Sequence, residues 1–278
     1  MFLDAPYFDP AFIAHKDDII LCSADMIHYG MSSDTLRTTS GFFSTMLSYN
    51  GTHKEGHHIA MDEPGKVLGT LLRMISGLQI PRWESYDYLE LILRAAEKYG
   101  MPGPISVIRH TITFPLMPPD PIRMYAIAAR HDWEEEVKQA STRSLTLSIH
   151  DPQYVDQLKQ IPPTYLIRLF NFHYRRVKEF RLLLDSPGLA GNNDNRRCDY
   201  CDHTIDNHPW RDLKEALVRE LEKKPMGSTV REHMNKWKVA QTCWATTCSN
   251  PPCHFQVYGR TETLVAINAC LDSLPTTV

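Results

Sequence analysis

The stretch DIILCSADMIHYGM, residues 18–31, decides how the first part of the chain folds. Apolar and polar residues alternate on both sides of Ala24-Asp25, which is the period of strands that bury one face. Two short runs of this kind around a turn are typical of a β-hairpin. The pattern therefore predicts two antiparallel strands that turn at Ala24-Asp25.

The residues after this hairpin change to a helical period. The segment 32–47 predicts a short pair of helices, with Ser40 as a cap for the second. Residues 57–63, HHIAMDE, predict a third strand. Apolar residues on one face predict three longer helices, at 65–77, 85–99 and 104–113. Strands and helices in this order indicate an α+β domain.

Several short motifs in this region follow one another at a characteristic spacing. They are Asp18-Ile19-Ile20-Leu21, Ser23-x-Asp25, Tyr29-x-Met31, Leu36-x-x-x-Ser40-x-x-Phe43-x-x-Met46, Leu71-Leu72-x-x-Ile75-x-Gly77 and Ala95-Ala96-x-x-Tyr99-x-Met101. In this order they resemble the BTB/POZ domain, and the chain is most similar to fungal BTB-type proteins with a helical extension and a cysteine-containing tail. The resemblance implies a homodimer that forms through the N-terminal strand and the first helices. It also implies a cullin-type ubiquitin-ligase scaffold as a partner.

The second half of the chain is expected to be mainly helical. Asp120-Pro121 predicts the start of one helix, and Asp132, followed by three glutamates, predicts the start of the next. A third helix is expected from about Pro163 to Leu184. The resulting α+β organisation has four parts: a BTB/POZ-like domain at 15–116, a helical extension at 117–187, a linker at 188–197 and a small, mainly helical zinc-binding domain at 198–278.

Composition and charge narrow the setting of the chain. It has 278 residues with a formal net charge of -3, so no strong overall field attracts nucleic acid or acidic lipid. It shows neither a basic leader nor an apolar run long enough to cross a membrane. We therefore expect a cytoplasmic or nuclear protein. In that reducing setting its seven cysteines should be thiols or metal ligands rather than disulfides.

Most of these cysteines lie in the last third of the chain. The C-x2-C pair Cys198 and Cys201 can supply two ligands to tetrahedral zinc, and a helical insert would bring later ligands to it. The Thr229 and Glu232 pair predicts a capping box within this insert. We favour Cys198, Cys201, Cys248 and Cys253 as structural zinc ligands, because Pro251-Pro252 stiffens the second loop. The alternates are Cys243, His203, His208 and His254.

Other interpretations of the tail stay open. The cysteines fit a set of unligated thiols, or a thiol-dependent enzyme. A transcription-associated protein would instead contact DNA through a basic face, formed here by Arg196, Arg197, Arg211, Lys214 and Arg219. Neither G-x-x-x-x-G-K-[ST] nor G-x-G-x-x-G occurs, so no phosphate-binding loop is predicted. The sequence favours a non-enzymatic protein–protein interaction module, such as a ubiquitin-ligase substrate adaptor, without catalytic or cofactor-binding residues.

Overall fold

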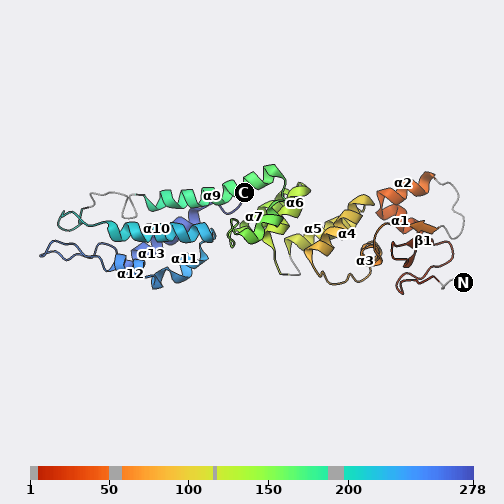
Figure 1. Ribbon diagram of the computed structural model, residues 1–278, viewed down its shortest axis with the longest axis horizontal. Helices are drawn as coiled ribbons and strands as arrows, with labels where there is room; N and C mark the ends of the chain where they lie inside the picture. Colours follow the sequence, from red (N-terminus) through yellow and green to blue (C-terminus); the bar gives the residue numbers. More distant parts are fainter. Residues whose placement is uncertain (1–5, 50–57, 115–117, 187–196) are drawn as a thin grey trace. The chain divides into compact units, whose positions relative to one another are not determined.

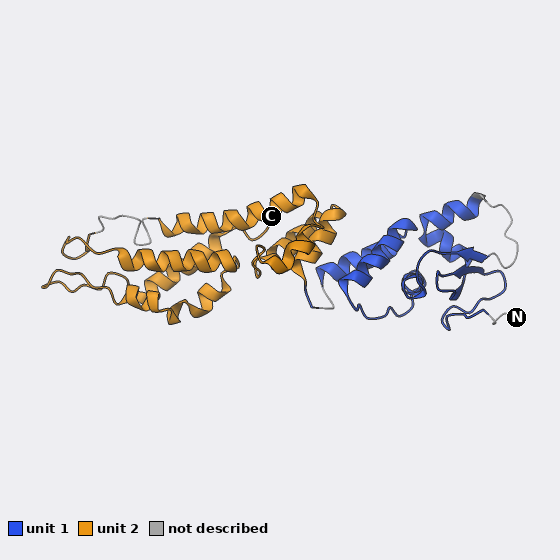
Figure 2. Ribbon diagram, in the orientation of Figure 1, with its two compact units in different colours: residues 1–119 blue, residues 120–278 orange. Residues whose placement is uncertain are grey.

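The computed structural model describes residues 6–49, 58–114, 118–186 and 197–278, and it shows a mixed α+β chain (Figure 1). The chain divides into two compact units, residues 1–119 and 120–278 (Figure 2). In the described ranges, no helix combines the length and the apolar character that crossing a membrane requires.

The first unit is built on a small sheet. Strand β1 (Ile19–Cys22) pairs antiparallel with β2 (His28–Met31), which confirms the predicted hairpin. The turn between them closes on a hydrogen bond of 2.9 Å from the Ser23 amide to the Ile27 carbonyl. Strand β3 (His58–Ala60) runs parallel to β1 on its other side, so the strand order is β2-β1-β3. This confirms a third strand, although His57 lies outside the described residues.

Five helices of the first unit follow the predicted order: α1 (Ser33–Thr39), α2 (Gly41–Tyr49), α3 (Gly65–Ile75), α4 (Tyr86–Lys98) and α5 (Pro102–Thr113). Local chemistry sets several of their ends. The Ser40 hydroxyl accepts from the Phe43 amide at 3.2 Å, as expected of a cap. Helices α3 and α4 are followed by Gly77 and Gly100, with φ of 66° and 58°, a conformation that favours glycine.

The core of the first unit lies between the sheet and these helices. Phe43, Leu71 and Leu89 are fully buried in it. The Tyr29 side chain of β2 is also buried, and its hydroxyl donates to the Gly65 carbonyl at 2.8 Å. Beside it, Gly30 passes so close to the N-terminal segment that a Cβ would lie 2.3 Å from Cα of Ala14. The segment before β1 therefore belongs to this unit.

The regular elements described in the second unit are all helices, joined by loops. Its elements are α6 (Pro121–Arg130), α7 (Glu134–Ser144), a 3-10 turn (Pro152–Tyr154), α8 (Val155–Leu158), α9 (Pro163–Leu184), α10 (His208–Lys223), α11 (Ser228–His233), a second 3-10 turn (Met234–Lys236), α12 (Lys238–Trp244) and α13 (Arg260–Ser273). Asp120 caps α6 by accepting from the Arg123 amide at 3.1 Å, as the Asp120-Pro121 pair predicts.

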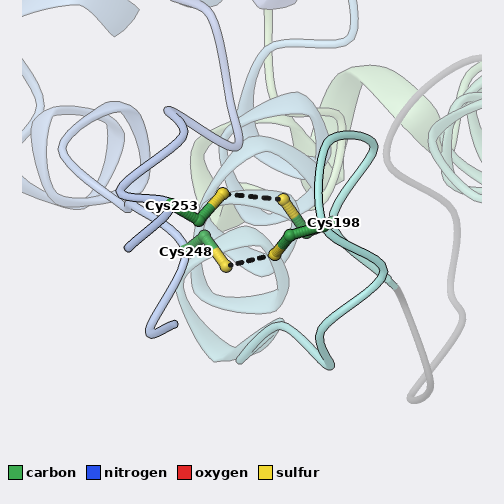
Figure 3. Close-up of side chains that lie close together, drawn as sticks. Cys198, Cys248 and Cys253 are labelled. Atoms are coloured by element: carbon green, nitrogen blue, oxygen red, sulfur yellow. Dashed lines mark hydrogen bonds between the residues drawn. The ribbon is translucent and has the colours of Figure 1, made fainter. Parts of the chain in front are cut away.

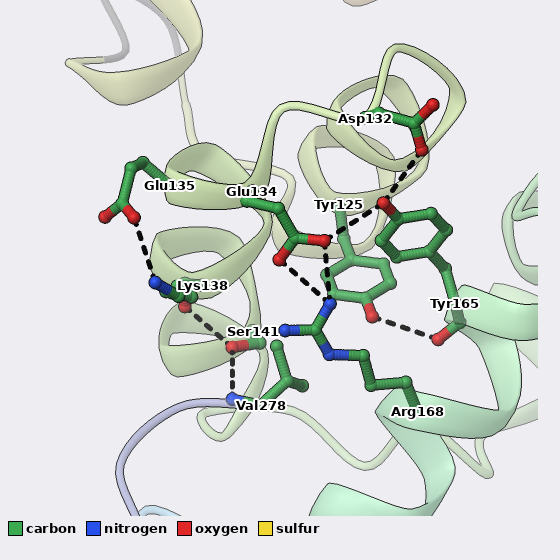
Figure 4. A network of polar contacts seen from close by, with 9 residues as sticks. All are labelled: Tyr125, Asp132, Glu134, Glu135, Lys138, Ser141, Tyr165, Arg168 and Val278. Carbon is green, nitrogen blue, oxygen red and sulfur yellow. Dashed lines mark hydrogen bonds and ion pairs between the residues drawn. The ribbon is translucent and has the colours of Figure 1, made fainter.

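The start predicted for α7 is confirmed in part: Glu134, Glu135 and Glu136 lie in its first turn, but Asp132 does not begin the helix. The helix begins at Glu134, and Asp132 has a φ of 53°, outside the helical region. Its carboxylate instead accepts a hydrogen bond from the Tyr165 hydroxyl at 2.9 Å (Figure 4). Glu134 binds Arg168 of α9 at 2.9 Å in the same network. The Asp132 side chain is therefore hydrogen-bonded to α9, and it does not begin α7 as the sequence predicts.

Helix α9 shares a core with the cysteine-containing segment. Phe180 and Leu184 of α9 pack in one apolar cluster with Leu217 of α10 and Ile267 of α13. The segments expected as extension and zinc-binding domain thus contribute to a single compact unit. The expected linker, residues 188–197, lies outside the described residues except for Arg197.

The predicted capping box in the insert is also wrong. Helix α11 begins at Ser228, and its N-cap is Gly227, with a φ of 78° and no side chain to cap with. A left-handed turn at glycine, rather than a Thr229–Glu232 exchange, introduces the helix. A Cβ at Gly227 would lie 2.9 Å from Leu271 of α13, so the turn is pressed against the core.

Candidate metal centre

The first cysteine pair lies on a tight loop that precedes α10. The Cys198 amide donates to the His203 carbonyl at 2.8 Å, and the Asp202 amide donates to the Cys198 carbonyl at 3.0 Å. Arg197 and Thr204 form an isolated antiparallel bridge at the base of the loop. Asp202 has a φ of 56°, which reverses the chain directly after Cys201.

The second loop, between α12 and α13, is closed by the same kinds of backbone contact. The Cys248 amide donates to the Phe255 carbonyl at 2.8 Å, and Thr247 and Gln256 form the bridge at its base. His254, directly after Cys253, has a φ of 47°. In both loops the residue before the first cysteine pairs with the third residue after the second cysteine. The two loops thus have matched closures although one spacing is C-x2-C and the other C-x4-C.

These two loops bring four thiols together. The sulfur of Cys198 lies 3.7 Å from that of Cys253, and the sulfur of Cys201 lies 3.6 Å from that of Cys248 (Figure 3). All four sulfurs lie within 4.8 Å of one another. With Zn–S bonds of roughly 2.3 Å, tetrahedral geometry places sulfurs about 3.8 Å apart, whereas a disulfide needs about 2.05 Å. The cluster therefore has metal-site spacing rather than disulfide spacing.

One side of the thiol cluster packs against the apolar core of the second unit. Cys198 and Cys248 are buried and belong to the apolar core, whereas Cys201 and Cys253 are half-buried. On the outer side, the rings of Tyr200 and Phe255 stack across the two loops, with centroids 6.3 Å apart and an interplanar angle of 8°. The two loops thus contact each other through this ring pair as well as through their thiols.

Without a metal, the thiols of the cluster differ in how easily they lose a proton. A hydrogen bond from the Asn250 side chain, aided by the His203 amide, lowers the pKa of Cys201 to about 6. Desolvation raises the pKa of Cys253 to about 12, and the neighbouring thiols add to that rise. One thiolate therefore forms easily, and further negative charge is resisted. A divalent cation would favour the loss of the remaining thiol protons, because its positive charge neutralises the thiolates that bind it.

The donor set fits a soft or borderline divalent metal. Four sulfurs fill the four positions of a tetrahedral ion, as in structural sites, whereas catalytic sites keep one position for water or substrate. Backbone amides of His203 and Phe255 also contact the sulfurs of Cys201 and Cys253, which stabilises the thiolate form. The arrangement can therefore act as a clamp between two loops.

The alternates from sequence lie outside this group. Cys243 is buried in the apolar core on α12. His203, His208 and His254 are exposed and do not join the cluster, although His203 and His254 shape the loops through their backbones. In the described ranges, this is the one close group of such residues suited to a metal.

Sequence reasoning missed Asn250, whose side chain hydrogen-bonds to Cys201, and the left-handed backbone of Asp202 and His254. A signal for these two residues was present, because Asp, Asn and His are enriched at positive φ. Asp202 and His254 each directly follow the second cysteine of their loop.

No family model matches the chain, and no curated protein matches it in sequence.

Proposed function

We propose that this chain is a non-enzymatic protein–protein interaction module, with a BTB/POZ-like N-terminal domain and a structural zinc site at Cys198, Cys201, Cys248 and Cys253. The observation that carries the metal part is the convergence of these four thiols at spacings of 3.6 and 3.7 Å. Zinc is the ion of choice for a tetrahedron of four thiolates with no open position.

A structural role for zinc also fits the place of the cluster in the unit. Its loops precede and follow the insert formed by α10, α11 and α12, and each is closed by only one isolated bridge. A metal bound to both loops ties the two ends of the insert together. Binding free energy of this kind is folding free energy, because the unfolded chain offers no preformed site.

The interaction role is supported by the first unit. Its order of a hairpin, two helices, a third strand and three helices agrees with the motifs that resemble the BTB/POZ domain. Its surface also exposes large apolar side chains, among them Tyr7, Ile13, Met26 and Phe42. Exposed apolar groups of this kind suit protein contacts. We propose homodimerisation through this unit, a cullin-type scaffold as partner, and residence in the cytoplasm or the nucleus.

Native mass spectrometry combined with metal analysis tests both parts of the proposal on the full chain. We expect a dimer in which each chain carries a zinc ion. Cys248→Ser should lose the zinc, whereas Cys22→Ser, a half-buried thiol on β1, should keep it. A zinc-free wild-type chain would overturn the metal part, and a monomer that persists at high protein concentration would overturn dimerisation.

A thiol-dependent enzyme is the second candidate, favoured by the lowered pKa of Cys201, about 6. Low-pKa thiols react quickly with alkylating agents, whereas zinc-bound thiolates are shielded. Iodoacetamide should therefore label Cys201 slowly until a chelator is added. Rapid labelling of the metal-loaded chain would favour the enzyme.

The DNA-binding alternative gains little from the described residues. Lys214 is buried and forms an ion pair with Asp185, and Arg197 pairs with Asp202 at 2.6 Å. These two members of the expected basic face are thus engaged within the protein, while Arg196 lies outside the described residues. A salt-dependent DNA titration of the full chain is the direct check.

A further inference from the structure

The second unit contains a cavity that shares no residue with the thiol cluster. It has a volume of about 620 Å³ and lies between α9, the end of α10 and the turn that contains Ile149 and His150. Small-molecule sites in proteins have volumes of about 300–1,000 Å³ and are mostly apolar with a few polar groups. The cavity is therefore large enough for a ring-bearing molecule.

Its walls combine aliphatic and flat aromatic surface. Ile149 is buried, Val177 is half-buried, and both line the cavity. The His150 ring stacks on Phe170, with centroids 5.6 Å apart and an interplanar angle of 25°. Flat aromatic walls favour a planar ligand, because rings stack or pack edge to face at such distances.

A buried histidine supplies a polar group with a defined role. Nε2 of His173 lies 2.8 Å from the Ser144 hydroxyl, which itself donates to the Ser141 carbonyl at 2.6 Å. In the arrangement in which the hydroxyl donates to Ser141, Nε2 of the neutral ring donates to Ser144 and Nδ1 carries the lone pair. Burial lowers the pKa of His173 to about 4, so the ring is neutral at pH 7. His173 is one of the residues that line the cavity, and in this tautomer its ring has one acceptor, Nδ1.

The charged residues around the cavity balance one another. Lys178, Arg181 and Glu222 line it, and Arg181 is paired with Glu215 at 3.2 Å. Arg181 is thus paired with a residue outside the lining, and the other two lining charges, Lys178 and Glu222, are of opposite sign. Such a rim favours a ligand without net charge, because a lone ionised group would be desolvated without a dedicated counter-ion.

We propose that this cavity binds a small, uncharged, planar molecule that donates one hydrogen bond. The flat walls would hold the ring, and the neutral imidazole of His173 would accept the hydrogen bond. This binding is separate from the zinc site, and it does not depend on the interaction role of the first unit.

Indole, 1-methylindole and indole-3-carboxylate form a matched probe set. Indole has the ring and the N–H donor, 1-methylindole lacks the donor, and the carboxylate adds a charge. Titration of the zinc-loaded full chain, followed by ligand-observed NMR, should show saturable binding of indole. Both analogues should bind about tenfold more weakly or worse, because a buried acceptor left unpaired or a buried charge left unmatched costs free energy.

A pair of variants on α9 locates the binding. Asn171 is an exposed residue of the cavity lining, and Asn171→Trp should block the mouth and abolish indole binding. Leu182 is an exposed residue of the same helix that does not line the cavity, so Leu182→Trp should bind indole like the wild type. Circular dichroism and zinc content check that both variants fold.

Three results would overturn the proposal. They are absence of indole binding to the folded wild type, equal binding to Asn171→Trp, and binding of either analogue that is as tight as that of indole or tighter.

Discussion

The two units hold distant segments together by different means. In the first unit, β1 pairs along its length with β2 and β3, and buried side chains bond to distant backbone, as Tyr29 does to Gly65 and Ser40 to Tyr99. In the second unit, the cysteine loops have one isolated bridge each and meet through their thiols. In the described residues, the first arrangement consists of backbone pairing and side-chain hydrogen bonds. The second brings four thiols to the spacing of a metal site, so a bound metal would complete its closure.

The largest effect is expected when the thiol cluster is broken. Structural zinc sites in small domains have apparent binding free energies of about 10–16 kcal/mol at neutral pH, most of which is folding free energy. Cys248→Ser, or chelation of the wild type, should therefore unfold the two cysteine loops, residues 197–204 and 247–256. Hydrogen exchange measured by mass spectrometry should show loss of protection there and unchanged protection in β1, β2 and α4.

Cys22→Ser is the matched control for that experiment, because Cys22 is a half-buried thiol in the first unit. It should leave zinc content and protection of the loops unchanged. If chelation left the loops fully protected, the comparison between the units would fail.

A core truncation in the first unit should give the next largest effect. Phe43 is fully buried between the sheet and the helices, and Phe→Ala changes in cores cost about 3–5 kcal/mol. Phe43→Ala should lower the free energy of unfolding of the first unit by that amount, measured by urea denaturation. The loss should be the same with and without chelator. A loss that grows when zinc is removed would show that the units are not independent.

The stability of the second unit is expected to depend on pH through His173, which has no counterpart in the tests of the first unit. Burial lowers the pKa of His173 from 6.5 to about 4, so between these values the unfolded chain binds the proton and the folded chain does not. Stability should therefore rise with pH from about 4 to 6.5, by up to about 3 kcal/mol.

His173→Gln should flatten that rise, as measured by urea denaturation of the wild type and the variant at each pH in the same excess of zinc, so that the effect of acid on metal binding is common to both. The first unit should not show this dependence on residue 173. An unchanged slope in the variant would mean that other groups cause the acid loss.

The smallest effect is expected for one buried hydrogen bond of the first unit. Tyr29→Phe removes the hydroxyl that donates to the Gly65 carbonyl at 2.8 Å and keeps the ring in the core. The free energy of unfolding should fall by about 1 kcal/mol, or somewhat more because the carbonyl is left unpaired. Thermal unfolding of the first unit is the measurement, and no change at all would indicate that water replaces the hydroxyl.

Local patterns were sufficient wherever an element is determined by its own residues. The alternation in residues 18–31 predicted β1 and β2, and glycine at 77 and 100 marked the ends of α3 and α4 because left-handed backbone favours that residue. Cap signals were correct at Ser40 and Asp120 because each side-chain oxygen accepts a hydrogen bond from an amide three residues later in the chain.

Patterns failed where a distant segment competes for the same side chain. Asp132 binds Tyr165 instead of capping α7, and Gly227 rather than Thr229 precedes α11 because the turn packs against Leu271. The thiol set illustrates both situations. The C-x2-C spacing and the stiff Pro251-Pro252 pointed to the four converging cysteines, but only tertiary structure shows that Cys243 is committed to the core. The cavity beside His173 has no local signature at all.

The matched loops have a consequence for the order in which the C-terminal half matures. The two thiol pairs lie at opposite ends of the α10–α12 insert, so neither pair alone can complete the tetrahedron. A nascent chain acquires the second pair only after the whole insert has been synthesised and has turned back on itself. If the four thiols bind zinc, bound zinc would indicate that the insert is complete and folded. A chain that is stalled or misfolded between the loops would fail to retain the ion.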